Sequence, residues 1–137
     1  MSKNTQMIFV NLPVVDLERS KTFYTAAGFT NNAKFSDDAT ACMVLSETIM
    51  VMLLTPAKWA RFMAKPLSDP KTTAQVLLCI SRESKSAVDT IVETAMKRGG
   101  RADPTPIQDL GFMYGRSFED PDGHIWEAVW MTPEVDM

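Results

Sequence analysis

The 137-residue sequence has a single histidine, only two cysteines and no long apolar run. Any histidine-dependent metal or acid–base chemistry would have to use His124. Because His124 directly follows an Asp-Gly pair, we expect it at the surface beside a turn. Cys42 and Cys79 lie in apolar, strand-like segments, which is typical of buried free thiols in a reducing compartment. We therefore expect no disulfide framework and assign neither cysteine a nucleophilic role.

Basic residues are also sparse and scattered. The longest basic cluster is Lys97-Arg98, and the formal net charge is -3 with an isoelectric point near 5.1. This charge distribution disfavours nucleic acid as a partner. No apolar segment approaches the roughly 18 to 20 residues that cross a bilayer, and residues 1–5 are short and polar. We expect a cytoplasmic protein without a membrane partner.

The first half of the chain alternates between strand-like and helix-like segments. An apolar, β-branched segment over 7–15 predicts a strand, Asp16 is a suitable N-cap for the next helix, and Gly28 is placed to end it. Short apolar segments separated by polar turn residues predict three further strands, near Phe35, at 41–45 and at 49–54. A short helix over 56–64 then leads into a linker over 65–70.

The second half repeats this order. The predicted elements are a strand at 76–80, a helix that begins after Ser84 and ends at Gly99-Gly100, a loop with Pro104 and Pro106, a strand at 112–118, a tight turn at 120–123 and a strand at 125–131. With 45% hydrophobic and 23% charged residues, the composition and length suit one globular domain over 1–137. We predict an α+β domain of two βαβββ modules, at about 5–65 and 72–137, whose mixed sheet forms a cup.

Two sequence motifs carry a family resemblance. Residues 14–20, with Phe23-Tyr24 and Gly28-Phe29, resemble the opening of vicinal oxygen chelate proteins, the glyoxalase, bleomycin-resistance and extradiol dioxygenase group. Residues 118–127 resemble the closing hairpin of the same proteins. The resemblance covers nearly the whole chain and implies the glyoxalase/bleomycin-resistance/dioxygenase fold. The sequence is most similar to a subgroup described as lactoylglutathione-lyase-like.

The same resemblance implies four positions for ligands of a divalent metal. They fall at Phe9, Leu53, Val76 (or the adjacent Gln75) and Glu127. Of these, only Glu127 carries a typical ligand, whereas a transition-metal site needs three or four converging donors. We therefore assign no metal ligands and expect no cofactor, although a divalent metal stays an alternative.

The closing hairpin predicts the surroundings of Glu127. If residues 120–123 form the tight turn, Glu119 pairs with His124 and Arg116 lies opposite Glu127. Tyr114, Arg116 and Glu127 would then share the face that lines the cup, whereas Trp126 and Trp130 would point away toward helices. The two side chains beside Glu127 could bind a ligand carboxylate or phosphate, with Glu127 as a base or acceptor. We favour the alternative, a cross-strand ion pair that fills the cup.

The functional prediction follows from these residues. Phe9 and Trp59, the latter at the rim of the cup, complete the predicted ligand-binding set with Tyr114, Arg116 and Glu127. We expect a metal-independent protein that binds a small molecule and, by analogy with the bleomycin-resistance branch, forms a homodimer. The alternatives are a metal-dependent lactoylglutathione-lyase-like or dioxygenase-like enzyme, and a metal-free enzyme in which Glu127 is the catalytic base.

Overall fold

The computed structural model describes residues 5–134 and divides into two compact units. The units are Met1–Ser68 and Asp69–Met137, and their boundary falls in the predicted linker. Each unit contains a mixed β-sheet with a helix on one face, which confirms the predicted α+β class.

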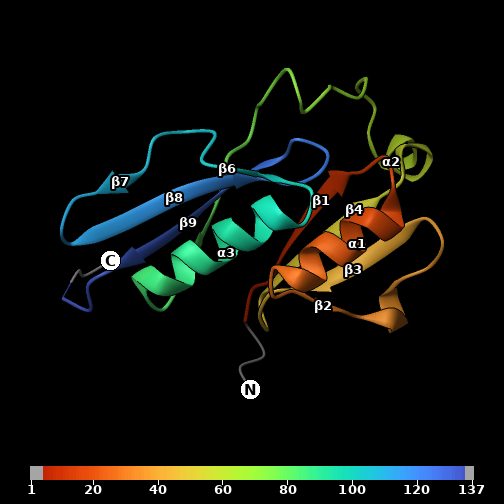
Figure 1. Cartoon of the computed structure of the whole chain (residues 1–137). Helices are drawn as coiled ribbons and strands as arrows, with labels where there is room; N and C mark the ends of the chain where they lie inside the picture. The colour runs from red at the N-terminus through yellow and green to blue at the C-terminus, as the bar shows by residue number, and fades with distance from the viewer. Residues whose placement is uncertain (1–4, 135–137) are drawn as a thin grey trace. The chain divides into compact units, whose positions relative to one another are not determined.

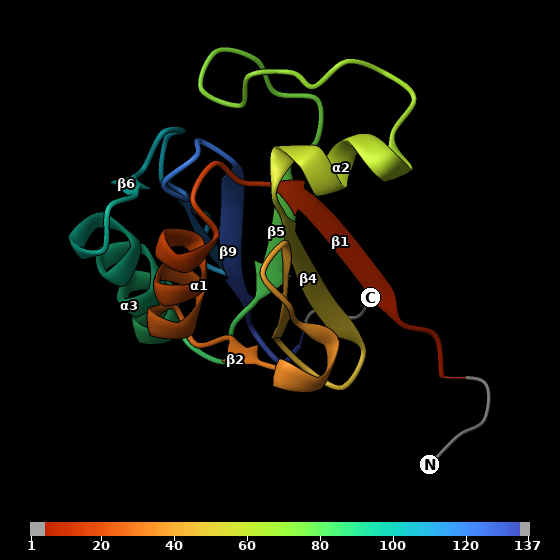
Figure 2. The same cartoon turned by 90° about the vertical axis from the view of Figure 1, so that its right-hand side faces the viewer.

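The first unit has a four-stranded sheet in the order β1-β4-β3-β2. Its elements are β1 (Ile8–Pro13), α1 (Leu17–Ala26), β2 (Thr30–Asn31), the 3-10 helix η1 (Ala33–Phe35), β3 (Thr40–Val44), β4 (Ile49–Leu54) and α2 (Pro56–Phe62). Strands β1 and β4 run parallel and lie side by side in Figure 2. Helix α1 begins where predicted, because the Asp16 side chain accepts a hydrogen bond from the Arg19 backbone N–H at 3.1 Å.

The core of this unit lies between α1 and the sheet. Tyr24 is fully buried, with edge-to-face ring contacts to Phe23 at 5.1 Å and to Phe29 at 5.2 Å between centroids. Met43 and Val51, which pair across β3 and β4, are also fully buried. The apolar side chains of the recognised opening motif other than Val15, which is exposed, therefore belong to the core and explain most of its residue pattern.

The second unit repeats the arrangement with the order β5-β9-β8-β6. Its elements are β5 (Leu78–Ser81), α3 (Lys85–Lys97), β6 (Arg101–Ala102), β7 (Gln108–Asp109), β8 (Met113–Glu119) and β9 (Ile125–Met131). The first and last strands again run parallel, and the short β7 pairs with β8. The predicted repeat in the order of elements is thus confirmed in the topology of the two sheets.

Helix α3 covers one face of this second sheet, across β8 and β9 (Figure 1). Ser84 caps the helix as predicted, accepting from the Ala87 backbone N–H at 3.0 Å. Beneath the helix, the rings of Phe118 and Trp126 stack at 6.3 Å between centroids, and both residues are buried. The prediction that Trp126 points toward a helix is confirmed.

Two predictions about strands are wrong. Phe35 ends the 3-10 helix η1 instead of forming a strand, because the Asn32 side chain caps that turn by accepting from the Lys34 N–H at 3.1 Å. The segment between α3 and β8, predicted as a loop, contains β6 and β7. Strands of two residues are too short to produce a recognisable alternation of apolar and polar side chains.

The predicted register of the closing hairpin is wrong by one residue. Glu119 pairs with Ile125, which places Ser117 opposite Glu127 and Arg116 opposite Ala128. The reason is the turn, which is one residue longer than predicted and closes with a hydrogen bond from the Asp120 N–H to the His124 carbonyl at 3.0 Å. Because side chains alternate along a strand, a register shift of one residue places the predicted partners on opposite faces of the sheet.

Cys42 is buried as predicted, but Cys79 is exposed on β5, so its predicted burial is wrong. Side chains alternate along β5, so Cys79 lies on the face away from α3, whereas its neighbour Ile80 on the α3 face is buried. Among residues 5–134, no helix is long and apolar enough to span a membrane.

Candidate functional site

The second sheet has two chemically different faces. One face packs on α3 and carries Tyr114, Arg116 and Phe118. The opposite face, here called the Glu127 face, carries the alternate residues of β5, β8 and β9. Its members are Cys79, Ser81, Met113, Gly115, Ser117, Glu119, Ile125, Glu127, Val129 and Met131.

Glu127 lies in the middle strand of this face. Its neighbours across the sheet are Cys79 on β5 and Ser117 on β8. The residue is half-buried, and no hydrogen bond or ion pair of its side chain is found among residues 5–134. A partly desolvated carboxylate without a cationic partner is stabilised by any donor that a ligand brings to it.

The thiol of Cys79 is electrostatically coupled to this carboxylate. Its partial burial and the negative charge of Glu127 raise the pKa of Cys79 above the usual value for a thiol. Since the thiolate is the nucleophilic form, the raised pKa keeps Cys79 protonated and weakly reactive at neutral pH. On the Glu127 face this residue is a small apolar neighbour of the carboxylate.

Most of the rest of the Glu127 face is apolar or small, and at its end Glu119 pairs with Arg101 at 3.1 Å. Gly115, opposite Val129, has no side chain, and a Cβ there would make only ordinary contacts at 3.8 Å or more. Val129, Met131 and Ile125 follow along β9 and are half-buried. The face therefore offers one carboxylate without a partner among the described residues, that of Glu127, beside apolar side chains, a combination common in small-molecule sites.

A hydroxyl pair lies next to Glu127. Ser117 is fully buried, and its Oγ accepts hydrogen bonds from the Thr105 backbone N–H at 3.1 Å and from the Thr105 hydroxyl at 2.8 Å. Thr105 belongs to the loop between β6 and β7, so this loop covers Ser117 on the Glu127 face.

The opposite face holds an ionic cluster against α3. Arg116 donates to Asp103 from Nε (3.0 Å) and Nη2 (2.7 Å), and to Asp89 of α3 from Nη1 (3.0 Å). Tyr114 also donates to Asp89, at 2.6 Å. The hydrogen bond to Asp103 raises the pKa of Arg116, so the guanidinium stays charged at every accessible pH. Three of the five N–H groups of Arg116 are thus bound to aspartates.

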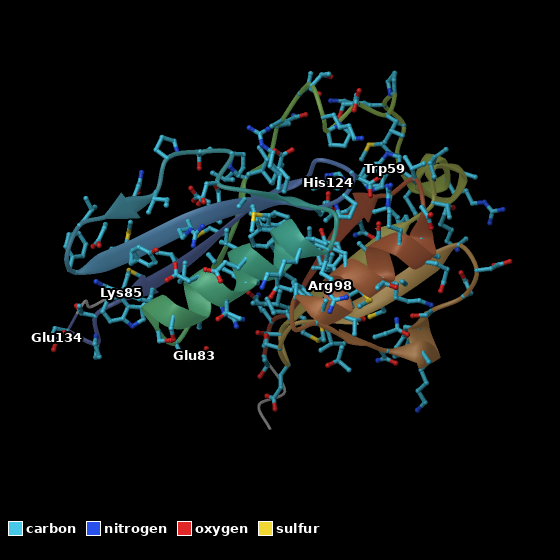
Figure 3. All side chains as sticks on the ribbon, in the orientation of Figure 1. Trp59, Glu83, Lys85, Arg98, His124 and Glu134 are labelled. Carbon is cyan, nitrogen blue, oxygen red and sulfur yellow. The ribbon has the colours of Figure 1, made fainter. Side chains whose placement is uncertain are left out.

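Lys85 extends this cluster at the first turn of α3, where Figure 3 labels it. Its ammonium lies 5.8 Å from the ring centroid of Tyr114 and 5.6 Å from that of Trp130, and 3.8 Å from a carboxylate oxygen of Asp109. Trp130 therefore contacts a helix residue, as predicted, through a cation–π interaction.

The predicted pairing of Arg116 with Glu127 is wrong, because the two side chains lie on opposite faces of the sheet. The carboxylates that Arg116 does bind, Asp89 and Asp103, were not predicted. Their only sequence signals are an acidic residue within the polar part of a helix and an Asp-Pro pair in a loop, and neither identifies a partner. Tyr114 and Arg116 remain predicted ligand-binding residues, but the Tyr114 hydroxyl and three N–H groups of Arg116 already donate to aspartates on the α3 face.

The Asp120-Pro121-Asp122-Gly123-His124 motif is a structural turn. The buried Asp120 side chain accepts from three backbone N–H groups, those of residues 122, 123 and 124, at 2.9 to 3.0 Å. His124, labelled in Figure 3, is half-buried and therefore less exposed than predicted. The backbone of Pro70 and Lys71 lies close to Gly123 of the same turn.

The residues at the four implied metal-ligand positions do not form a metal site. Phe9 is 53% exposed on β1, whereas Leu53 is completely buried. Phe9 pairs with Met50, so Leu53, three residues further along β4, points to the other face of that sheet. Val76 precedes β5 and is exposed, and within residues 5–134 no three His, Cys, Asp or Glu side chains cluster for a metal. The donor set is one carboxylate.

In the first unit, the predicted ligand-binding residues are Phe9 and Trp59. Trp59 lies on α2, and its indole N–H is buried without a hydrogen-bond partner among the described residues (Figure 3). The exposed ring of Phe9 and this unpaired donor are compatible with ligand contacts, and their ligand roles stay predictions.

One segment of the chain matches a family model, and the fold matches known structures. Residues 6–46 match the family model described as bleomycin resistance protein-like N-terminal. The fold is that of glyoxalase/bleomycin resistance/dioxygenase proteins of known structure. Among proteins of curated function, none matches the sequence significantly.

Individual solved structures are similar over almost the whole chain. A hypothetical protein from S. aureus is 26% identical, with a TM-score of 0.76 over 91% of this chain and 93% of its own. A glyoxylase/bleomycin resistance protein/dioxygenase domain from Frankia sp. is also 26% identical, with a TM-score of 0.68 over 98% and 96%. A lactoylglutathione lyase from Agrobacterium tumefaciens is 15% identical, with a TM-score of 0.66 over 94% and 96%, and shows the shared fold alone.

Proposed function

We propose that the protein binds a small, partly apolar molecule that carries a cationic or hydrogen-bond-donating group, without the divalent metal of its superfamily. The observation that carries the proposal is Glu127, a half-buried carboxylate with no side-chain partner in the described chain. Its apolar surroundings would strengthen a charge-assisted hydrogen bond to a ligand. The net charge of -3 also favours the approach of a cation.

The residues at the other implied metal-ligand positions also favour binding without a metal. Phe9, Leu53 and Val76 have no metal-binding atoms in their side chains, and a single carboxylate does not hold a transition metal. The alternative of a metal-dependent lactoylglutathione-lyase-like or dioxygenase-like enzyme is therefore disfavoured, because the implied positions do not supply enough metal ligands.

The metal-free enzyme, with Glu127 as base and the substrate carbonyl held by Arg116, also loses support. The side chain of Arg116 points to the α3 face and binds two aspartates there. What remains for Glu127 is the role of a binding carboxylate. We also propose a homodimer, which light scattering coupled to size exclusion would test.

The first experiment measures metal content and ligand charge preference. Elemental mass spectrometry on protein purified without a histidine tag should find far less than one transition metal per chain. In a titration followed by NMR amide shifts, benzamidine, an aromatic cation, should perturb residues of β5 and β9 around Cys79 and Glu127. Benzoate, an anion of similar size, should not perturb them.

The matched variant is Glu127→Gln, which keeps the shape and removes the charge. A charge-assisted hydrogen bond is worth about 1.5 to 3 kcal/mol, so benzamidine affinity should fall roughly 10-fold or more. Stoichiometric metal that is lost in Glu127→Ala, or benzamidine binding that is indifferent to Glu127→Gln, would refute the proposal.

A further inference from the structure

The loop that follows β6 connects the two faces of the second sheet. The Asp103 backbone N–H donates to the Ser117 carbonyl at 2.8 Å, and from there the chain crosses the edge of β8. The Asp103 side chain lies on the α3 face with Arg116, whereas Thr105, two residues later, lies on the Glu127 face with Ser117. The loop is therefore held on both faces of one strand.

The backbone of Asp103 makes this crossing possible. Its φ of 53° is the only positive φ of a non-glycine residue within residues 5–134. Asp tolerates this left-handed conformation better than most residues, yet the conformation is still strained. The two parallel hydrogen bonds from Arg116 compensate for the strain and fix the direction in which the loop leaves β6.

The hydrogen bonds of Thr105 determine what its hydroxyl can still do. The hydroxyl uses its single proton to donate to Ser117 Oγ at 2.8 Å. Its remaining lone pairs can only accept. Thr105 is half-buried beside Ser117, and Ser117 lies directly opposite Glu127. The Glu127 face thus presents two acceptors on neighbouring segments, one charged and one neutral.

We propose that Thr105 contacts the ligand as a second acceptor beside Glu127, and that Asp103 and Arg116 are positioning residues that hold Thr105 there. The inference rests on the proposed function, because it needs a ligand on the Glu127 face. It narrows the ligand to cations with several N–H donors, such as amidinium or guanidinium groups. Such a group donates to the carboxylate and to the hydroxyl at the same time, whereas a quaternary ammonium has no N–H to donate.

The test compares two aromatic cations on the full chain by NMR titration. Benzamidine has several N–H donors and benzyltrimethylammonium has none. Thr105→Val should weaken benzamidine binding by roughly 3- to 10-fold, as expected for the loss of one hydrogen bond, and should leave benzyltrimethylammonium within about twofold. Thr105→Ser, which keeps the hydroxyl, should restore benzamidine binding.

The positioning role is tested by a double-mutant cycle. Asp103→Asn keeps a residue that tolerates the left-handed φ and removes the charge that Arg116 binds. It should weaken benzamidine binding about as much as Thr105→Val, and should have no further effect in the Thr105→Val background. Lys21→Gln removes the ion pair to Glu18 within α1 of the first unit and serves as the control with unchanged binding.

The outcomes separate the two proposals. If Glu127→Gln affects neither cation, the proposed function fails and this inference fails with it. If Glu127→Gln weakens both cations but Thr105→Val weakens them equally or not at all, Thr105 is not an acceptor for the ligand. If Asp103→Asn weakens benzamidine binding further in the Thr105→Val background, its effect does not pass through Thr105 and the positioning role is refuted.

Discussion

Arg116 and Asp103 form two parallel hydrogen bonds, Nε to Oδ1 at 3.0 Å and Nη2 to Oδ2 at 2.7 Å. The Arg116 side chain is only 13% exposed and also binds Asp89. Arg116→Ala would leave two carboxylates without their cation on the α3 face. We expect the free energy of unfolding to fall by about 2 to 4 kcal/mol, measured by urea denaturation.

The matched control is Arg101→Ala. Arg101 also forms an ion pair, with Glu119 at 3.1 Å, but its side chain is 71% exposed. Exposed pairs contribute about 0 to 1 kcal/mol, so this variant should stay close to the wild type. Equal losses in the two variants would mean that the Arg116 cluster contributes no more than a surface ion pair.

The pair of Tyr114 and Asp89 predicts a pH dependence of stability. The hydrogen bond from Tyr114, together with Arg116, lowers the pKa of Asp89. A carboxyl whose pKa is lower in the folded state stabilises the fold above its unfolded pKa. This contribution is lost as the pH falls through the lower, folded pKa. As the pH falls below about 4, the free energy of unfolding should therefore decrease less steeply in Asp89→Asn than in the wild type, as measured by urea midpoints.

On the alkaline side the sign is reversed. The hydrogen bond to Asp89 and burial raise the pKa of Tyr114. A group whose folded pKa is raised stabilises the fold below its unfolded pKa, near 10, and loses this contribution as the pH rises through the folded pKa. Tyr114→Phe should cost about 0.5 to 1.5 kcal/mol at neutral pH and remove that alkaline decline. If Tyr114→Phe loses stability at alkaline pH as steeply as the wild type, Tyr114 is not the group responsible for that decline.

Much of the fold could be predicted because local signals agree with the tertiary structure. Asp16 and Ser84 are side-chain caps that begin α1 and α3 where the sequence indicates. The apolar runs over β3, β4 and β9 are long enough to show their burial. By contrast, β6 and β7 have two residues each and form only because β8 offers hydrogen-bonding partners. Such strands have no local signal to detect.

The site was less predictable, since it depends on one register. Glu127 was identified from its motif, but its neighbours depend on whether the turn before β9 contains four or five residues. The Asp120 carboxylate binds the N–H groups of residues 122, 123 and 124 and so stabilises the longer turn. With the longer turn, Ser117 instead of the predicted Arg116 lies opposite Glu127. Asp103 and Thr105 then enter the site through contacts that are distant in sequence.

Cys79 reports directly on the charge of Glu127. Because partial burial and Glu127 raise the pKa of the thiol, Glu127→Gln should lower that pKa and shift the pH profile of alkylation to lower pH. Native protein would be treated with iodoacetamide between about pH 7 and 10 and followed by intact mass. Cys79→Ser identifies the reacting site, since the buried Cys42 should stay unmodified. An identical profile in Glu127→Gln would show that the two groups do not interact.

Gly123 is required by the turn before β9 for two reasons. Its φ is 103°, and a Cβ there would lie 3.0 Å from the backbone N of Lys71 and the backbone O of Pro70. Gly123→Ala should therefore lower the free energy of unfolding by about 2 to 4 kcal/mol, because backbone strain adds to a steric clash that no side chain can relieve. Gly111→Ala is the control, since its φ of 85° is also positive but no atom lies within 4 Å of the added Cβ. That variant should lose only about 1 kcal/mol. Urea denaturation of both variants separates the two contributions, and equal losses would mean that the packing of residues 70 and 71 against this turn does not restrict position 123.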